Sequence, residues 1–214
     1  MGGDVKLYSY FRSSAAYRVR IALNLKQVPY EPVFVHLVKD GGRHKHSEYR
    51  AVNPQMRVPA LALSSGETLI QSMAIIEYLD EAFPDPALLP TDAAERAHVR
   101  AVAQIVACDI HPLNNSGTLA YLRKLGHDDA TVNAWYADWV TAGFEAIEKL
   151  IRPGPYAFGQ HVSLADLCLV PQVYNARRFK VPLDAFAKIA AVEAACNKLA
   201  AFEKARPENQ PDAE

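Results

Sequence analysis

Apolar residues change their spacing several times in the first half of the chain, and each change predicts a different element. Residues 6–10 alternate between polar and apolar side chains, as in a half-buried strand. From Ala15 to Leu23 the apolar residues recur at helical spacing. Residues 30–35 predict a second strand, which Pro32 places at an edge, and residues 60–63 and 67–70 predict a hairpin. With a helix from 71 to 79, the order is β-α-β, a polar connection, then β-β-α.

The first strand meets the first helix at Arg12, Ser13 and Ser14. The first backbone N–H groups of a helix have no partner within it, and that end carries a partial positive charge that can hold an anion. Serines are also ordinary N-cap residues, and no G-x-S-x-G pattern or neighbouring base supports a serine hydrolase. From these residues alone, the turn is either a plain helix cap or an anion site.

Two further stretches point to the same kind of ligand. Val58-Pro59 directly precedes the hairpin and is a candidate cis bond, which would leave the Val58 backbone able to pair with an extended peptide. Ser72 is expected to N-cap the next helix and so to provide a second helix start for a carboxylate. Together these stretches favour a small peptide-like ligand.

The second half of the chain predicts a separate helical domain. Three prolines between residues 83 and 90 indicate a linker between an α/β domain at 4–84 and an all-helical domain at 92–206. Pro112 is expected to end or kink the first long helix, and Ser163 with Asp166 forms a capping box. Residues 207–214 are polar and are expected to fray.

Composition narrows the class of partner. The 214 residues are 50% hydrophobic with a net charge of -1, which argues against nucleic acid or a membrane as the main partner. No secretory signal is recognised, and the three cysteines form no C-x-x-C pair, so a cytoplasmic location is expected. His44 and His46 lack further ligands at a suitable spacing, so no metal site is predicted.

A family resemblance then adds to these observations. The run from Ser13 to Leu23, S-S-A-A-Y-R-V-R-I-A-L, resembles the S-S-C-S-W-R-V-R-I-A-L signature of zeta-class glutathione transferases. The stretches Asn53-Pro…Val58-Pro59 and Gln71–Leu79 are similar to the glutathione site of that family, and the similarity extends over nearly the whole chain. The resemblance implies a thioredoxin-like domain followed by an all-helical domain, a homodimer, and glutathione as the cofactor.

The resemblance also implies roles for particular residues. Ser13 or Ser14 would stabilise the glutathione thiolate, with Ser13 preferred for the direct contact. Arg12 and Arg178 would bind the carboxylates of a small dicarboxylate substrate, and Arg178 is preferred over Arg177. The expected glutathione contacts are the Val58 backbone, Gln71 and Ser72, and at secondary positions His44, Gln55, His111 and Asn115.

The implied reaction is the cis–trans isomerisation of an acid such as maleylacetoacetate, by thiolate addition, bond rotation and elimination. Many zeta-class chains carry cysteine where this one has Ala15, so the nucleophile must come from glutathione. Lowering its thiol pKa by about two units requires about 2.7 kcal/mol, within reach of one hydroxyl and a helix terminus. Maleylpyruvate is the alternative substrate, although arginines found in such chains are absent at 116–118. A general glutathione transferase or a binding module of this fold is the third possibility.

Overall fold

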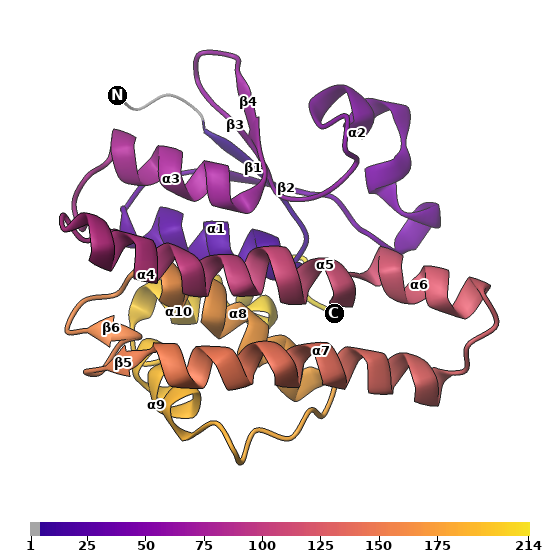
Figure 1. Ribbon diagram of the computed structural model, residues 1–214. Helices are drawn as coiled ribbons and strands as arrows, with labels where there is room; N and C mark the ends of the chain where they lie inside the picture. The colour runs from indigo at the N-terminus through magenta and orange to yellow at the C-terminus, as the bar shows by residue number, and fades with distance from the viewer. Residues whose placement is uncertain (1–4) are drawn as a thin grey trace. The chain divides into compact units, whose positions relative to one another are not determined.

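The computed structural model describes residues 5–214, which form two compact units. Unit 1 contains the chain up to Ala87 together with Lys198–Glu214, and unit 2 contains Leu88–Asn197. The sequence predicts a helical domain that extends to residue 206, whereas the structure places Lys198–Glu214 in unit 1. The difference arises because α10, Ala200–Ala205, packs against α1, Ser14–Leu25 (Figure 1).

A mixed four-stranded sheet organises unit 1, with the strands in the order β2-β1-β3-β4. β1 runs parallel to β2 and antiparallel to β3, and β3 is antiparallel to β4. β2 is therefore an edge strand, as its proline predicts. The strands are β1 Lys6–Ser9, β2 Glu31–Phe34, β3 Ala60–Ala62 and β4 Thr68–Ile70.

Two helices of unit 1 pack side by side, α1 and α3 (Figure 1). α1 is buried along most of its length, including the arginines at 18 and 20. The connection from β2 to β3 is polar, as expected, and contains short helical turns. The remaining helical elements of unit 1 are η1 Lys39–Gly41, η2 Arg43–Lys45, α2 Ser47–Val52, α3 Ser72–Ala82 and η4 Pro207–Asn209.

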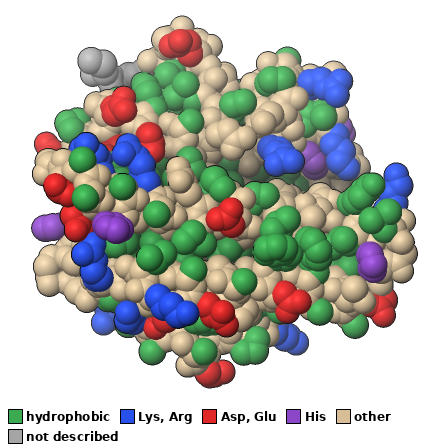
Figure 2. All heavy atoms as spheres, viewed as in Figure 1, with side chains coloured by type: hydrophobic (Ala, Val, Ile, Leu, Met, Phe, Trp, Pro, Cys, Tyr) green, Lys and Arg blue, Asp and Glu red, His purple; other side chains and the backbone are tan. Residues whose placement is uncertain are grey.

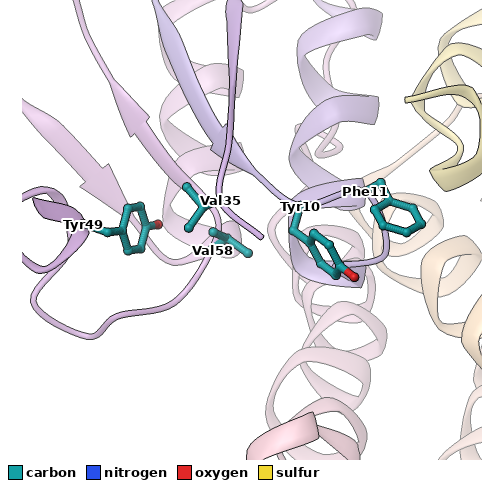
Figure 3. Packing of buried hydrophobic residues seen from close by; sticks show 5 residues of the cluster. All are labelled: Tyr10, Phe11, Val35, Tyr49 and Val58. Carbon is teal, nitrogen blue, oxygen red and sulfur yellow. The ribbon is translucent and has the colours of Figure 1, made fainter. Parts of the chain in front are cut away.

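A small apolar cluster lies at the end of the sheet from which the β1–α1 turn leaves. Its buried members are Tyr10, Phe11, Val35, Tyr49 and Val58. Figure 3 shows Val35 and Val58 between the rings of Tyr49 and Tyr10. The cluster thus joins the turn after β1 to the segment before β3, both of which carry predicted site residues.

Unit 2 is mainly helical. Its longest helix, α7, runs from Asp129 to Leu150, and α8 continues through Pro171. The predicted capping box at Ser163 and Asp166 is present at the start of α8. The elements of unit 2 are α4 Ala93–Gln104, η3 Ile105–Ile110, α5 His111–Asn114, α6 Ser116–Lys124, α7, β5 Arg152–Pro153, β6 Phe158–Gly159, α8 Leu164–Arg178 and α9 Ala187–Cys196.

Pro112 does not end the first long helix of unit 2. The six residues of η3 adopt a π-helix, and the His111 N–H donates to the Val106 carbonyl, five residues earlier. Proline lacks the N–H that an α-helix would use at this position, and the wider π turn before it lets the chain continue into α5. The proline thus changes the helix type without ending the helical run.

The 207–214 segment is ordered, so the prediction of a frayed tail is wrong. Gln210 donates from Nε2 to the carbonyls of Lys204 (2.9 Å) and Arg206 (2.8 Å), and Asn209 donates to the Glu203 carbonyl (2.7 Å). These bonds satisfy carbonyls at the end of α10 that the helix itself leaves without partners. Within residues 5–214, no helix is long and apolar enough to cross a membrane.

Candidate functional site

The register of the sheet gathers several predicted site residues at one end. Tyr8 pairs with Ala60, and Ala60 pairs with Ile70. The turn after β1, the Val58-Pro59 segment before β3 and the start of α3 after β4 therefore leave the sheet at the same end. The strand pairing thus explains why residues far apart in the sequence become neighbours.

The β1–α1 turn presents Ser13 as the N-cap of α1. The turn is closed by the Ser13 N–H, which donates to the Tyr10 carbonyl (2.9 Å), and the Ser13 hydroxyl accepts from the Ala16 N–H (3.2 Å). A hydroxyl that accepts from a backbone N–H keeps its own hydrogen for donation to an anion. Ser13 is half-buried, whereas Ser14, the first residue of α1, is buried.

Arg20 holds the turn from the inside. Its buried guanidinium donates to the Ser9 hydroxyl (3.1 Å), the Phe11 carbonyl (3.0 Å) and the Ala205 carbonyl (3.0 Å). A buried cation requires several partners, and the carbonyls of the turn supply them. Arg20 therefore fixes the backbone on which Arg12 and Ser13 stand.

Arg12 projects from the same turn and is exposed. Its Nη2 and Nε donate to the Tyr10 hydroxyl (2.9 and 3.2 Å), and its guanidinium carbon lies 4.9 Å from the centroid of the Phe11 ring. Two aromatic side chains thus hold the guanidinium, and within residues 5–214 its Nη1 donates to no acceptor. This arrangement suits an external carboxylate.

The Val58 backbone has no partner within residues 5–214. The Val58-Pro59 bond is cis, as the sequence predicts. The preceding Arg57 carbonyl accepts from the Tyr49 hydroxyl (2.7 Å) and from Nδ2 of Asn53 (2.6 Å), which fixes the approach to Val58. The Val58 N–H and carbonyl are therefore held in place and available for an extended ligand.

Gln71, not Ser72, is the N-cap residue of α3, and Ser72 is its first residue. Gln71 has φ of 70°, a left-handed conformation that costs a residue other than glycine about 1–3 kcal/mol and is common at ligand sites. Its Nε2 donates to Oε1 of Gln55 (2.7 Å). The Ser72 hydroxyl accepts from Nη1 of the buried Arg18 (3.3 Å), which places a positive charge behind the helix start.

His44 lies in η2, in the connection between β2 and β3. Its pKa is lowered, first by partial burial and then by the neighbouring charges of Lys45 and His46. Figure 2 shows Lys, Arg and His side chains gathered over α2 and the segment before it. Among the described residues, no hydrogen bond joins His44 to Gln55, Val58 or Gln71, so its place in the site stays a prediction.

The other predicted residues belong to unit 2. His111 begins α5, and Asn115 is the N-cap of α6, where its Oδ1 accepts from the Gly117 N–H (3.2 Å). Asn115 thus caps a helix, and this structural role is independent of its expected contact with glutathione.

Arg178 ends α8, and its guanidinium carbon lies 4.9 Å from the centroid of the Phe179 ring. The Phe179 ring stacks on the buried Tyr136, with 3.9 Å between centroids. The neighbouring Arg177 is bonded through Nε to both carboxylate oxygens of Glu193 (3.0 and 3.1 Å). This pairing engages Arg177, and the preference for Arg178 stays a prediction.

Sequence reasoning missed three supporting residues, Tyr10, Arg18 and Arg20. The helical spacing of the apolar residues indicates no partner for Arg18 or Arg20, yet every residue from Ala16 to Leu23 is buried in the structure. A run of helical residues buried on all sides requires partners for its charges. The burial of Arg18 and Arg20 results from the packing of α3 and α10 on α1, and the local sequence pattern does not show this packing.

The chain is similar to proteins of a known family. Residues 12–82 match the family model described as "Glutathione S-transferase, N-terminal domain". Maleylacetoacetate isomerase of Pseudomonas aeruginosa is 51% identical over 208 residues, covering 97% of this chain and 98% of the relative.

Two solved structures are also similar. The holo structure of a maleylpyruvate isomerase, described as a zeta-class bacterial glutathione S-transferase, has 52% identity and a TM-score of 0.94, covering 98% of this chain and 100% of that one. Maleylacetoacetate isomerase from Anaeromyxobacter dehalogenans, with glutathione in its active site, has 40% identity and a TM-score of 0.89, covering 100% of both chains. With its thioredoxin-like sheet and helical second unit, this chain belongs to the zeta-class glutathione transferase family.

Proposed function

We propose that this protein is a glutathione-dependent cis–trans isomerase of a small cis-enedioyl dicarboxylate, with maleylacetoacetate as the substrate. The observation that carries the proposal is the β1–α1 turn, where the Ser13 hydroxyl at a helix start and the exposed Arg12 guanidinium stand on adjacent residues. One group suits a sulfur anion and the other suits a carboxylate.

The residues at the end of the sheet fit glutathione. The unpartnered Val58 backbone would pair with the cysteinyl part of the tripeptide, and Gln71 with Ser72 would hold its γ-glutamyl carboxylate. Arg18 would add charge behind Ser72, and Gln55 would act through its hydrogen bond to Gln71. When bound, glutathione supplies the sulfur nucleophile that adds to the double bond and leaves again after rotation.

Ser13 would hold the sulfur anion by donating its hydroxyl hydrogen. A hydrogen bond to a charged group contributes about 1.5–3 kcal/mol, and a helix terminus adds about 0.3–1 kcal/mol. Together these correspond to a lowering of the thiol pKa by roughly one to three units. Hence Ser13 and the start of α1 are sufficient, and no side-chain base is required.

Arg12 and Arg178 would bind the two carboxylates of the substrate. The planar guanidinium matches a carboxylate with two parallel N–H donors. Arg12, held against Tyr10 and Phe11, would also offset the negative charge that develops on the substrate during addition. His44, His111 and Asn115 are proposed as secondary contacts of glutathione.

The test is an isomerisation assay on the purified protein with and without glutathione. We expect conversion of maleylacetoacetate only when glutathione is present, and conversion at the same rate without it would exclude the proposal. Maleylpyruvate is the second candidate, favoured by the similarity to the zeta-class maleylpyruvate isomerase structure. Under the proposal, kcat/KM for maleylacetoacetate exceeds that for maleylpyruvate in the same assay.

The proposal includes a homodimer in the cytoplasm. The cysteines at 108, 168 and 196 are all free thiols, and two of them are buried, which suits a reducing compartment. Size-exclusion chromatography with light scattering tests the dimer, and a monomeric mass at working concentration would exclude it.

A further inference from the structure

The 207–214 segment reaches the β1–α1 turn and supplies it with an acceptor. The Phe11 N–H donates to Oδ2 of Asp212 at 3.0 Å, although the two residues are 201 positions apart. Asp212 is half-buried, and the Ala213 N–H donates to the Gln210 carbonyl (3.0 Å). The carboxylate is therefore presented by an ordered piece of chain.

This bond completes the hydrogen bonding of the turn. Arg20 binds the Phe11 carbonyl from inside, the Ser13 N–H closes the turn on Tyr10, and Asp212 binds the Phe11 N–H. Phe11 is thus fixed at both its N–H and its carbonyl. A backbone N–H bonded to a carboxylate is a charge-assisted hydrogen bond, stronger than one between neutral groups.

The same segment also supports the aromatic side chain that binds Arg12. His36 accepts the N–H groups of Val38 (3.1 Å) and Lys39 (2.8 Å) at Nδ1, so its hydrogen is on Nε2, which donates to Oε1 of Glu214 (3.2 Å). The His36 ring meets the Tyr10 ring edge to face, with centroids 4.9 Å apart.

Glu214 also forms an ion pair with Lys39, whose hydrogen bond is the main cause of the lowered pKa of that carboxyl group. A chain of contacts therefore runs from Glu214 through His36 and Tyr10 to Arg12. The segment that contains Glu214 also accepts the Phe11 N–H through Asp212.

We propose that Asp212 is a positioning residue for the substrate: by holding the Phe11 N–H, it fixes the β1–α1 turn so that Arg12 faces the substrate carboxylate. Asp212 touches neither substrate nor glutathione in this role, and it acts through the backbone. The inference rests on the proposed function, in which Arg12 binds a carboxylate.

The test compares Asp212→Ala with Asp212→Asn, because asparagine keeps an oxygen that can accept from Phe11. A displacement of about 1 Å in a positioning group can cost about a hundredfold in rate. For Asp212→Ala we expect KM for the dicarboxylate to rise about tenfold or more while the thiolate absorbance of bound glutathione titrates as in wild type, because Ser13 is also held by Ala16. Asp212→Asn should restore most of the loss.

Glu208→Ala is the matched control, since Glu208 is an exposed carboxylate in the same segment. Glu208→Ala should leave the KM for the dicarboxylate and the thiolate titration unchanged. Wild-type KM for the dicarboxylate in Asp212→Ala, or a loss that Asp212→Asn does not restore, would overturn the inference.

Amide hydrogen exchange at Phe11 gives a readout that does not depend on activity. We expect exchange to accelerate in Asp212→Ala and to stay slow in Glu208→Ala, and unchanged exchange in Asp212→Ala would contradict the inference. A wild-type protein with no glutathione-dependent isomerisation would instead refute the proposed function, so the two failures are distinguishable.

Discussion

Ser13 has two roles in this account, and a pair of substitutions separates them. Its hydroxyl caps α1 by accepting from the Ala16 N–H (3.2 Å), and it is proposed to donate to the glutathione thiolate. Replacing an N-cap serine by alanine costs about 1 kcal/mol of stability, whereas glycine costs only a few tenths. Ser13→Ala therefore removes both roles, and Ser13→Gly removes mainly the contact with sulfur.

Loss of a hydrogen bond to a charged group removes about 1.5–3 kcal/mol, which raises the thiol pKa by about one to two units. We expect this rise in both variants, measured by the ultraviolet absorbance of the bound thiolate against pH. In urea unfolding, Ser13→Ala should lose about 1 kcal/mol and Ser13→Gly much less. If Ser13→Gly binds glutathione with a wild-type thiol pKa, Ser13 is only a helix cap and the reasoning fails.

Three further changes test other parts of the structure. Arg178→Ala should raise the KM for the dicarboxylate about tenfold or more because it removes a charge-assisted bond. The matched control Arg177→Ala should leave this KM unchanged. Equal KM values in the two variants would exclude Arg178 from the site. Lys26→Met removes a buried ammonium that contacts Asp80 at 2.6 Å, and urea unfolding should show a loss of about 3 kcal/mol; a loss below about 1 kcal/mol would show that the pair is not stabilising. Burial raises the pKa of Tyr136 to about 12, above its ordinary value of about 10. As the pH rises from about 10 toward 12, the free energy of unfolding of wild type should therefore fall by about 1.4 kcal/mol per pH unit relative to that of Tyr136→Phe. Parallel curves of unfolding free energy against pH would contradict this.

The elements of unit 1 follow from local patterns, because alternation and helical spacing are properties of neighbouring residues. Such patterns predict the strand at 6–10, which the structure forms over Lys6–Ser9, the edge position of the strand with Pro32, and the hairpin from 60–63 and 67–70. The sequence predicts Ser72 as the N-cap of α3, one residue after the N-cap in the structure. Ser72 has the usual N-cap chemistry, but the left-handed Gln71 takes that position.

Interactions between distant segments account for what the sequence did not predict. The polar sequence of the 207–214 segment predicts a frayed tail, yet hydrogen bonds to the end of α10 and to Phe11 order it. The roles of Arg18 and Arg20 likewise depend on Ser72 and Ala205, which lie far along the chain. No local pattern contains these pairings, because each joins two segments whose meeting is decided by the packing around α1.

The position of the glutathione sulfur can be seen in a crystal structure of the protein with bound glutathione. We expect the sulfur within hydrogen-bonding distance of the Ser13 hydroxyl, with the cysteinyl backbone paired to Val58. A sulfur atom distant from the hydroxyls of both Ser13 and Ser14 would contradict it.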